Sequence, residues 1–244
     1  MKSSFLTRLF DLVAPRTCGI CGRRLSVGES VLCGVCHLHL PFTYLWRTPY
    51  DNEMARLFWG KIPFAGGDDG QRPNSVERVA ALFFYGAQTP VSRLIHNMKY
   101  NGWIEAGESL GRMAANMMAA DRFFEGIDII VPMPLTRLRQ WKRGYNQSME
   151  IARGVSSVTG IPVCNDIVRR VRFDGSQTRK HGWERTQNVD GVFRLKDASK
   201  AEGKHILVID DIVTTGATVA SCAQQLCKAP GVRISIMSIG FTKE

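Results

Sequence analysis

The chain has 244 residues, of which 44% are hydrophobic and 22% charged, and a formal net charge of +10. These values are typical of a globular protein with its own core and exclude a disordered chain. No apolar run approaches the roughly 18 residues that span a bilayer, so no transmembrane segment is expected. Residues 1–13 show helical apolar spacing and no secretory cleavage pattern, which predicts a short N-terminal helix and a cytoplasmic protein.

Four of the seven cysteines form two C-x-x-C pairs, Cys18 with Cys21 and Cys33 with Cys36. Zinc takes four thiolates at tetrahedral corners, and two such turns supply two corners each. The spacing therefore predicts a structural zinc module. A thioredoxin-like redox pair, a c-type haem attachment at residues 33–37 (CGVCH) and four free thiols are the alternatives. The odd cysteine total and the expected reducing compartment argue against disulfides.

After the cysteines, residues 46–74 carry prolines and a glycine-rich run, which predicts an irregular connector. From there apolar strands alternate with amphipathic helices. The expected strands are residues 79–85, 127–131, 163–168, 192–195, 205–209 and 232–241, and the expected helices are residues 90–100, 105–124, 145–158 and 217–227. This order predicts an α/β fold, a mostly parallel sheet flanked by helices, with ligands at the carboxyl ends of its strands. We divide the chain into a cysteine module (1–50), a connector (51–75) and a sheet domain (76–244).

The positive charge is concentrated in residues 134–196, which contain 13 basic and 5 acidic residues for a net charge of +8. A solvated surface patch is the simplest interpretation of such a run. A site for a polyanion, either a nucleotide phosphate group or a nucleic-acid backbone, is the alternative. Composition alone does not choose between these partners.

The sharpest local signal is the sequence VIDDIVTTGAT at residues 208–218. An apolar strand delivers Asp210 and Asp211, and a Thr/Gly-rich turn then opens a helix whose amides and hydroxyls can cradle a phosphate. Two carboxylates repel a bare phosphate, so they need sugar hydroxyls or a metal as their partner. Together these groups suit a ribose 5-phosphate. The alternative is a strand ending in two solvated acids with Thr214 or Thr215 as an ordinary N-cap.

That string resembles the 5-phosphoribosyl 1-diphosphate (PRPP) motif of type I phosphoribosyltransferases, and the chain as a whole resembles the ComF family. This family joins a four-cysteine zinc module to a phosphoribosyltransferase-type domain. The matching pieces occur in the family's order. After the cysteine pairs they are LIHNMKY (94–100), VPMPL (131–135) with RGYNQ (143–147), the loop bearing Ser176, Gln177, Arg185 and Asn188, and the Asp-Asp string. Any one of the earlier pieces is weak, but five in order are specific.

The resemblance implies a role for each part of the site. Asp210 and Asp211 would take the ribose hydroxyls, and residues 170–190 would form a lid over the diphosphate. The remaining PRPP contacts that it implies are Met133, Pro134, Leu135, Arg143, Arg179, Lys180, Arg185, Thr214, Thr215, Gly216, Ala217 and Thr218. The implied chemistry is Mg²⁺-dependent displacement of diphosphate at ribose C1, with zinc as the structural metal.

Two functions from different classes follow. The first is a phosphoribosyltransferase with an unknown acceptor, linked by the ComF resemblance to DNA uptake in natural transformation and to the import machinery. The second is a catalytically silent protein that retains the PRPP site and binds single-stranded DNA. For the second, Trp141, Tyr145, Phe173 and Trp183 lie among the basic residues and could stack on bases.

Overall fold

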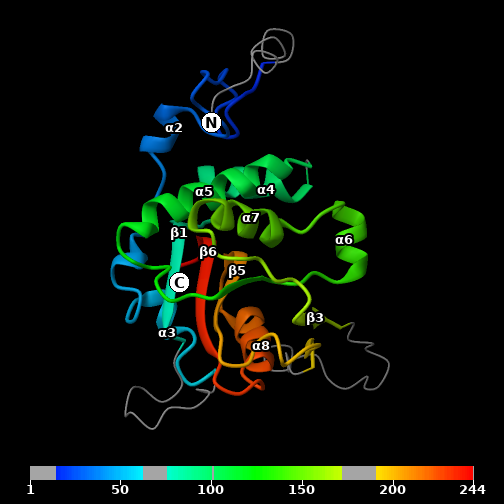
Figure 1. Ribbon diagram of the computed structural model, residues 1–244. Helices are drawn as coiled ribbons and strands as arrows, with labels where there is room; N and C mark the ends of the chain where they lie inside the picture. Colours follow the sequence, from blue (N-terminus) through cyan, green and yellow to red (C-terminus); the bar gives the residue numbers. More distant parts are fainter. Residues whose placement is uncertain (1–14, 63–75, 101, 172–190, 244) are drawn as a thin grey trace, which may run out of the picture.

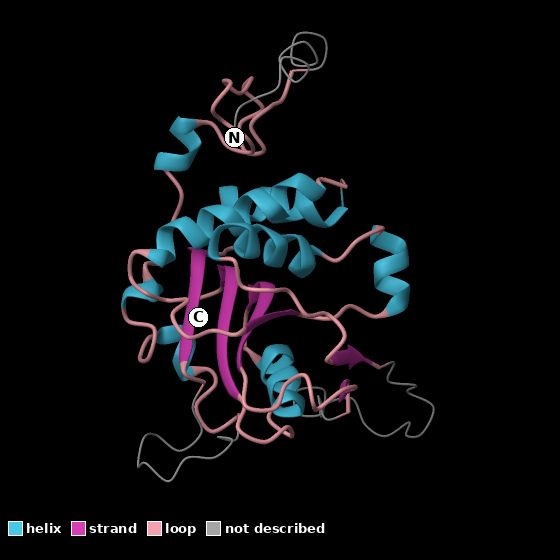
Figure 2. Cartoon of the chain, in the orientation of Figure 1, coloured by secondary structure: helices cyan, strands magenta, loops and turns pink. Residues whose placement is uncertain are grey.

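The computed structural model describes residues 15–62, 76–100, 102–171 and 191–243. Its centre is a four-stranded sheet in the order β1-β6-β5-β2, in which every neighbouring pair is parallel (Figures 1 and 2). The strands are β1 (Arg78–Phe84), β2 (Ile129–Pro132), β5 (His205–Val213) and β6 (Arg233–Phe241). The predicted α/β fold with a parallel sheet is confirmed.

Helices cover both faces of this sheet, as the continuous apolar strands predicted. One face carries α4 (Pro90–Tyr100), α5 (Ile104–Ala119) and α7 (Gln147–Thr159), and the other carries α8 (Ala217–Leu226) (Figure 1). Successive residues of β5 alternate between two hydrophobic clusters: Leu207 belongs to the cluster with α4, α5 and α7, and Val208 to the cluster with α8. The sheet is therefore the shared wall of two cores.

Two glycines let α5 and α7 cross in close contact. A Cβ atom on Gly111 would lie 2.1 Å from the Ile151 carbonyl oxygen, and one on Gly154 would lie 2.0 Å from the Glu108 carbonyl oxygen. These distances are far below van der Waals contact, so only glycine fits at either position. The close crossing fixes the N-terminus of α7 against the sheet.

Several element boundaries differ from the sequence predictions. The helix predicted for residues 105–124 ends at Ala119, before Arg122, which has a φ of 57°. Of the strand predicted for 163–168, only an isolated bridge at Val163 joins the sheet; β3 (Val168–Arg170) instead pairs antiparallel with β4 (Phe193–Leu195) outside it. β5 extends past residue 209 to Val213, and α6 (Arg137–Arg143) was not predicted.

The cysteine module and the described part of the connector both pack onto the sheet domain. The module carries α2 (Gly34–Leu38), and its Ser30 hydroxyl lies 2.7 Å from the Ser109 hydroxyl on α5. η1 (Leu45–Arg47) lies near the end of the module, and the expected connector contains α3 (Glu53–Arg56), followed by Phe58, which is fully buried in the α8 core. Residues 51–62 therefore pack against the sheet domain through buried side chains.

Two sequence predictions lie outside the described residues. They are the N-terminal helix at residues 1–13 and most of the lid, with its basic residues Arg179, Lys180 and Arg185. Within the part of the chain that the structure describes, no helix is both long and apolar enough to cross a membrane.

Candidate functional site

The two acidic residues lie inside the last part of β5, the central strand that pairs with both β2 and β6. The Asp210 carboxylate accepts hydrogen bonds from its neighbour's backbone N–H at 2.9 Å and from the Ser148 hydroxyl at 3.2 Å. The Asp211 carboxylate pairs with the Lys99 ammonium at 2.9 Å. The N-terminus of α7 and the C-terminal part of α4 thus hold one carboxylate each.

The electrostatics of the pair are unbalanced. Burial, followed by the negative charge of Asp211, raises the pKa of the Asp210 carboxyl from 3.8 to about 7. Burial disfavours a charged carboxylate, and a like charge beside it adds to the effect. The ionised form of such a carboxyl is stabilised by a ligand that donates hydrogen bonds to it or by a cation. Strongly perturbed carboxyl groups of this kind are more frequent at functional sites than elsewhere.

The turn at residues 214–216 connects the acidic strand to α8. Thr214 and Thr215 are exposed, and Thr218 is half-buried in the first turn of the helix. Gly216 is the N-cap of α8 with a φ of 72°, and no side chain caps the helix. A Cβ there would approach the Phe58 ring to 3.0 Å, so both backbone geometry and space favour glycine. The helix N-terminus therefore presents backbone amides beside exposed hydroxyls, a combination that suits an anion.

The loop after β2 begins on the strand next to β5, so it lies at the same edge of the sheet. Met133 donates its N–H to the Ile209 carbonyl at 2.8 Å and accepts from the Asn146 side chain at 3.0 Å. Its side chain is 3% exposed and packs in the α8 core. Pro134 and Leu135 are half-buried and line a cavity. The cavity-facing part of the loop is therefore Pro134 and Leu135.

The segment RGYNQ (143–147) connects α6 to α7 and anchors both to α4. Arg143 donates from Nη1 to the Gln147 side-chain oxygen at 2.9 Å, and its guanidinium lies 5.5 Å from the centre of the Tyr100 ring. The Tyr145 hydroxyl donates to the Met98 carbonyl. The Gln147 side-chain nitrogen is buried and has no hydrogen-bond partner. This segment positions the N-terminus of α7, which carries Ser148.

Four residues near the site were missed at the sequence level. Lys99 and Ser148 contact the acidic pair directly, and Lys61 donates to the Thr215 carbonyl at 3.2 Å. Arg170 lies close enough to Asp210 for the two charges to influence each other. The position of Lys99, directly after the apolar residues that bury α4, could have indicated a lysine that faces the site. The position of Lys61 in the connector gave no such indication.

A cavity of about 1130 Å³ opens on the β2 side of the site. Pro134 and Leu135 form one wall, and Arg153, Arg170 and Lys196 contribute positive charge. The volume is slightly above the usual range for small-molecule sites, about 300–1,000 Å³. The acidic pair and the 214–218 turn do not line this cavity, so it adjoins the candidate ribose position and does not contain it.

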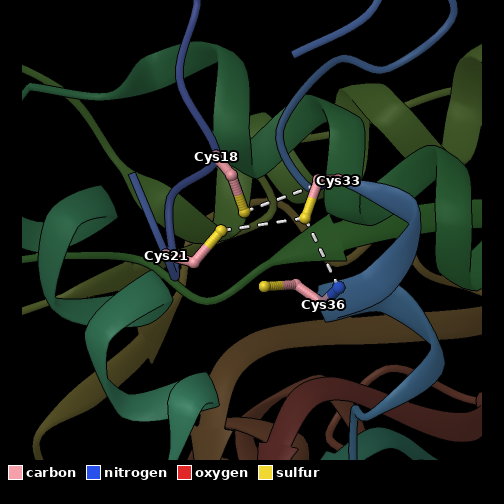
Figure 3. A group of neighbouring side chains, drawn as sticks. All are labelled: Cys18, Cys21, Cys33 and Cys36. Atoms are coloured by element: carbon pink, nitrogen blue, oxygen red, sulfur yellow. Dashed lines mark hydrogen bonds between the residues drawn. The ribbon is translucent and has the colours of Figure 1, made fainter. Parts of the chain in front are cut away.

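The four cysteines of the module face a common centre (Figure 3). Their sulfur atoms all lie within 4.8 Å of one another, and those of Cys21 and Cys33 are 3.8 Å apart. Four thiolates at the usual zinc–sulfur distance of about 2.3 Å are separated by roughly 3.8 Å. The cysteine quartet is therefore close to the size of a tetrahedral zinc site.

The thiols of the quartet are electrostatically distinct. The backbone N–H of Cys36 is the largest influence on Cys33 and lowers the pKa of its thiol to about 6, whereas burial raises the pKa of the Cys36 thiol to about 12. A second N–H, that of Cys33, points to the Cys18 sulfur at 3.4 Å. Backbone amides directed at sulfur favour thiolates, the form that binds a metal.

His205 lies at the opposite end of β5 from the acidic pair and has no contact with it. Its imidazole lies at the start of β5, opposite the acidic end, with Nε2 2.9 Å from the Ser235 hydroxyl and Nδ1 3.1 Å from the Gly126 carbonyl. Burial lowers its pKa to about 4, so the ring is neutral near pH 7. His205 has a structural role.

These features define a class of protein: a parallel α/β sheet with a candidate anion and sugar site at its carboxyl edge and a four-cysteine module packed on its helices. A scan against protein-family models finds no match. Among curated proteins, the chain is 30% identical over 233 residues to DNA utilization protein YhgH of Salmonella typhimurium, covering 92% of this chain and 96% of the relative. It is 31% identical over 216 residues to competence protein F of Haemophilus influenzae, covering 86% and 90%.

The chain therefore belongs to the family of competence protein F and YhgH, and the ComF resemblance predicted from its motifs is confirmed. Among solved structures, the Bacillus subtilis glutamine PRPP amidotransferase has a TM-score of 0.37 at 22% identity, covering 53% of this chain and 25% of that one. Adenine phosphoribosyltransferase of Leishmania tarentolae has a TM-score of 0.36 at 11% identity, covering 78% and 88%. Scores at this level do not establish a common ligand or activity.

Proposed function

We propose that the chain binds PRPP with Mg²⁺ at the carboxyl edge of its sheet. One observation carries the proposal: the acidic pair near the end of β5 and the uncapped Thr/Gly turn after it lie at the same sheet edge as the loop that follows the neighbouring strand β2. The carboxylates of Asp210 and Asp211 accept hydrogen bonds from the two ribose hydroxyls. The amides and hydroxyls of residues 214–218 hold the 5-phosphate.

The diphosphate then extends toward β2. Because Met133 uses both its N–H and its carbonyl within the protein and proline has no N–H, we assign the backbone contact in this loop to Leu135. Arg143 reaches the diphosphate with guanidinium nitrogens other than Nη1, and Arg179, Lys180 and Arg185 close over it from the lid at 170–190. Mg²⁺, which prefers oxygen ligands, supplies charge neutralisation to the departing diphosphate when bound.

Two further assignments complete the proposal. A zinc ion bound by Cys18, Cys21, Cys33 and Cys36 is structural, because four thiolates leave no open position. The names of the relatives, competence protein F and DNA utilization protein YhgH, support a role in DNA uptake or DNA use, which we place in the cytoplasm beside the import machinery. We propose residues 1–50 as the module, residues 51–75 as a connector whose described part packs on the sheet, and residues 76–244 as the PRPP-binding domain.

A turnover assay tests whether the site is catalytic. Zinc-loaded protein is incubated with PRPP, Mg²⁺ and a panel of nucleobases, and diphosphate release is measured. A phosphoribosyltransferase releases diphosphate only in the presence of its acceptor. PRPP binding without release for any acceptor would instead support the catalytically silent binding protein.

The raised pKa of Asp210 predicts a pH-dependent effect of Asp210→Asn on ligand-free protein. The folded-state pKa of about 7 lies above the ordinary value of 3.8, so the folded state favours the protonated carboxyl. Its contribution to the free energy of unfolding is present at low pH and is lost as pH rises through about 7. We expect wild type to lose stability relative to Asp210→Asn between about pH 5 and about pH 8.

Urea unfolding of both proteins at the two pH values measures this difference. The cysteine module is the same in wild type and variant, so its contribution to stability cancels in the comparison. A stability difference that stays constant with pH would show that the Asp210 carboxyl is ionised throughout.

Single-stranded DNA is the second candidate ligand, and a specific surface favours it. On α6, the Trp141 side chain is 81% exposed and Leu138 is 44% exposed, beside exposed Arg139 and Lys142. Large apolar side chains are usually buried, and an exposed tryptophan among cations suits base stacking combined with phosphate contacts. Gln140, on the same helix, lines the cavity to which Arg169 and Lys196 contribute.

Replacing Trp141 with alanine is expected to weaken binding of a single-stranded oligonucleotide about 5- to 100-fold, the usual effect of losing one base–aromatic stack. The matched control is Trp59→Ala, because Trp59 is 48% exposed and also lies beside an arginine, Arg56 at 5.9 Å, but outside the basic block. Fluorescence anisotropy at two salt concentrations measures both variants. Equal affinities for the two variants, or binding that does not weaken with salt, would remove α6 as a DNA contact.

A further inference from the structure

A second cavity, of about 610 Å³, lies between the cysteine module and α4. The module contributes Gly19 and Ile20, α4 contributes Lys99 and Tyr100, and the strand ends contribute Tyr85 after β1 and Ile212 in β5. Its volume is within the range of small-molecule sites. Nothing in the proposed PRPP contacts uses this space.

The module wall of this cavity is fixed in place. Gly19 donates its N–H to the Val31 carbonyl at 3.0 Å and accepts at its own carbonyl from the Asn97 side chain at 3.4 Å. A Cβ on Gly19 would lie 2.2 Å from the Trp103 ring, so the backbone of the first C-x-x-C turn rests directly on that tryptophan. The zinc module therefore forms a packed wall of the cavity and not a separate appendage.

The cavity also adjoins the acidic pair. Lys99, which lines it, is bonded to Asp211, and Ile212 is the next residue along β5. In the sheet order β1-β6-β5-β2, the cavity lies toward the β1 side and the loop with Pro134 and Leu135 lies on the β2 side. The candidate ribose position on β5 is between them.

This arrangement matches the requirement of a displacement at ribose C1. An incoming nucleophile reacts when it is held in line with the bond that breaks, on the side opposite the leaving group. With the diphosphate extended toward β2, the opposite side of the ribose faces the second cavity. The space is therefore placed where an acceptor is needed.

The lining indicates the chemistry of that acceptor. Tyr85, His96 and Tyr100 are aromatic, and the rings of His96 and Tyr100 lie 4.8 Å apart, while Arg93 and Lys99 add positive charge. No acidic residue is among the described residues that line the cavity. Aromatic walls suit a planar ring, and cationic donors such as the Arg93 guanidinium suit carbonyl oxygens on its edge.

We propose that the cavity between the cysteine module and α4 is the acceptor pocket, and that it takes a nucleobase bearing ring carbonyl groups. The proposal rests on the PRPP function above. In the transfer, a ring nitrogen of the base forms a bond to C1, and the C1–O bond to diphosphate breaks. Diphosphate leaves with the bonding electron pair, and the proton of the ring nitrogen passes to solvent. The module that holds zinc thereby also sets acceptor specificity.

Saturation-transfer NMR with hypoxanthine, uracil and adenine on zinc-loaded full-length protein tests the pocket without requiring turnover. We expect the two carbonyl-bearing bases to bind and adenine to bind more weakly. Ile20→Trp, which fills the cavity, is expected to weaken base binding about tenfold or more, or about 1.4 kcal/mol. Val27→Trp is the matched control, because Val27 is a module residue that is 58% exposed and does not line the cavity.

Two further measurements keep the outcomes separate. The first is the zinc content and the thermal shift with PRPP, recorded for every variant. The second is the variant Tyr100→Ala, which removes one aromatic wall of the cavity; because Tyr100 is 63% exposed, this change does not disturb the module. If base binding is unchanged in both Ile20→Trp and Tyr100→Ala, or is absent from wild type, the acceptor-pocket assignment is wrong. PRPP stabilisation of wild type would then still support the proposed function. Loss of PRPP stabilisation in wild type removes the proposed function, whatever the bases do.

Discussion

Replacing Asp210 and Asp211 together with asparagine is expected to abolish stabilisation of the protein by PRPP and Mg²⁺. For wild type, PRPP at a hundred times its Kd adds about 2.7 kcal/mol, or a rise in Tm of about 5–10 °C. Hydrogen bonds to a charged acceptor contribute about 1.5–3 kcal/mol each, so losing two weakens binding by about two to four powers of ten. At the same PRPP concentration, the variant is expected to show no measurable shift.

Differential scanning fluorimetry of zinc-loaded protein measures this effect, with Asp121→Asn as the control. Asp121 is an exposed carboxylate that follows α5, so the control removes a negative charge away from the acidic end of β5. The control is expected to keep the full shift. Ligand-free Asp210→Asn/Asp211→Asn is expected to remain folded, because the substitutions remove a repulsive pair. An equal PRPP shift in wild type and the double variant would place the ligand elsewhere.

Replacing Cys33 with serine is expected to abolish zinc binding. This is the second of the two largest effects that we predict. The Cys33 thiol is fully buried and shares the centre of the quartet, so a hydroxyl leaves only three thiolates. Structural zinc sites contribute about 10–16 kcal/mol of apparent binding free energy, and most of it depends on a complete ligand set. Metal analysis is expected to give one zinc per wild-type chain and almost none for the variant.

Cys164→Ser provides the matched control, because Cys164 is a half-buried cysteine outside the module. It is expected to retain full zinc. Because Gly19 rests on the Trp103 ring, loss of zinc is also expected to change tryptophan fluorescence in the Cys33 variant. Full zinc occupancy of the Cys33 variant would contradict the four-thiolate assignment.

Much of the fold was predictable because it depends on local patterns. The strands that became β1, β5 and β6 are apolar runs with β-branched residues, and the helices that became α4, α7 and α8 have one apolar face. Their alternation fixes a parallel sheet with ligands at its carboxyl edge. The sequence does not give the register by which β2 and β5 bring their two loops together.

The parts that were missed depend on tertiary contacts. Gly111 and Gly154 determine how closely α5 and α7 cross, yet each appears in the sequence as an ordinary helix-weakening glycine. Residues 51–62 read as a connector because prolines and glycines flank them, but Phe58 is buried against the turn at Gly216. Lys99 was assigned only to a family motif, and its ion pair with Asp211 appears only once the chain folds.

The same difference between local patterns and tertiary contacts applies to the candidate site. The acidic pair and the Thr/Gly turn were found because strand, carboxylates and helix start are adjacent in the sequence. The buried side chain of Met133 and the engagement of Arg143 with Gln147 were not foreseen, because both depend on residues distant in the fold or on helix α6. A sequence motif thus predicts which loop contacts a ligand more reliably than it predicts which atoms of that loop make the contact.

The most direct test of the PRPP site is a crystal structure of the zinc-loaded protein with PRPP and Mg²⁺. The ribose hydroxyls are expected within hydrogen-bond distance of the Asp210 and Asp211 carboxylates, with the 5-phosphate on the amides of residues 214–218 and the diphosphate toward Leu135. PRPP bound at another surface, with the acidic pair keeping its contacts to Ser148 and Lys99, would contradict the assignment.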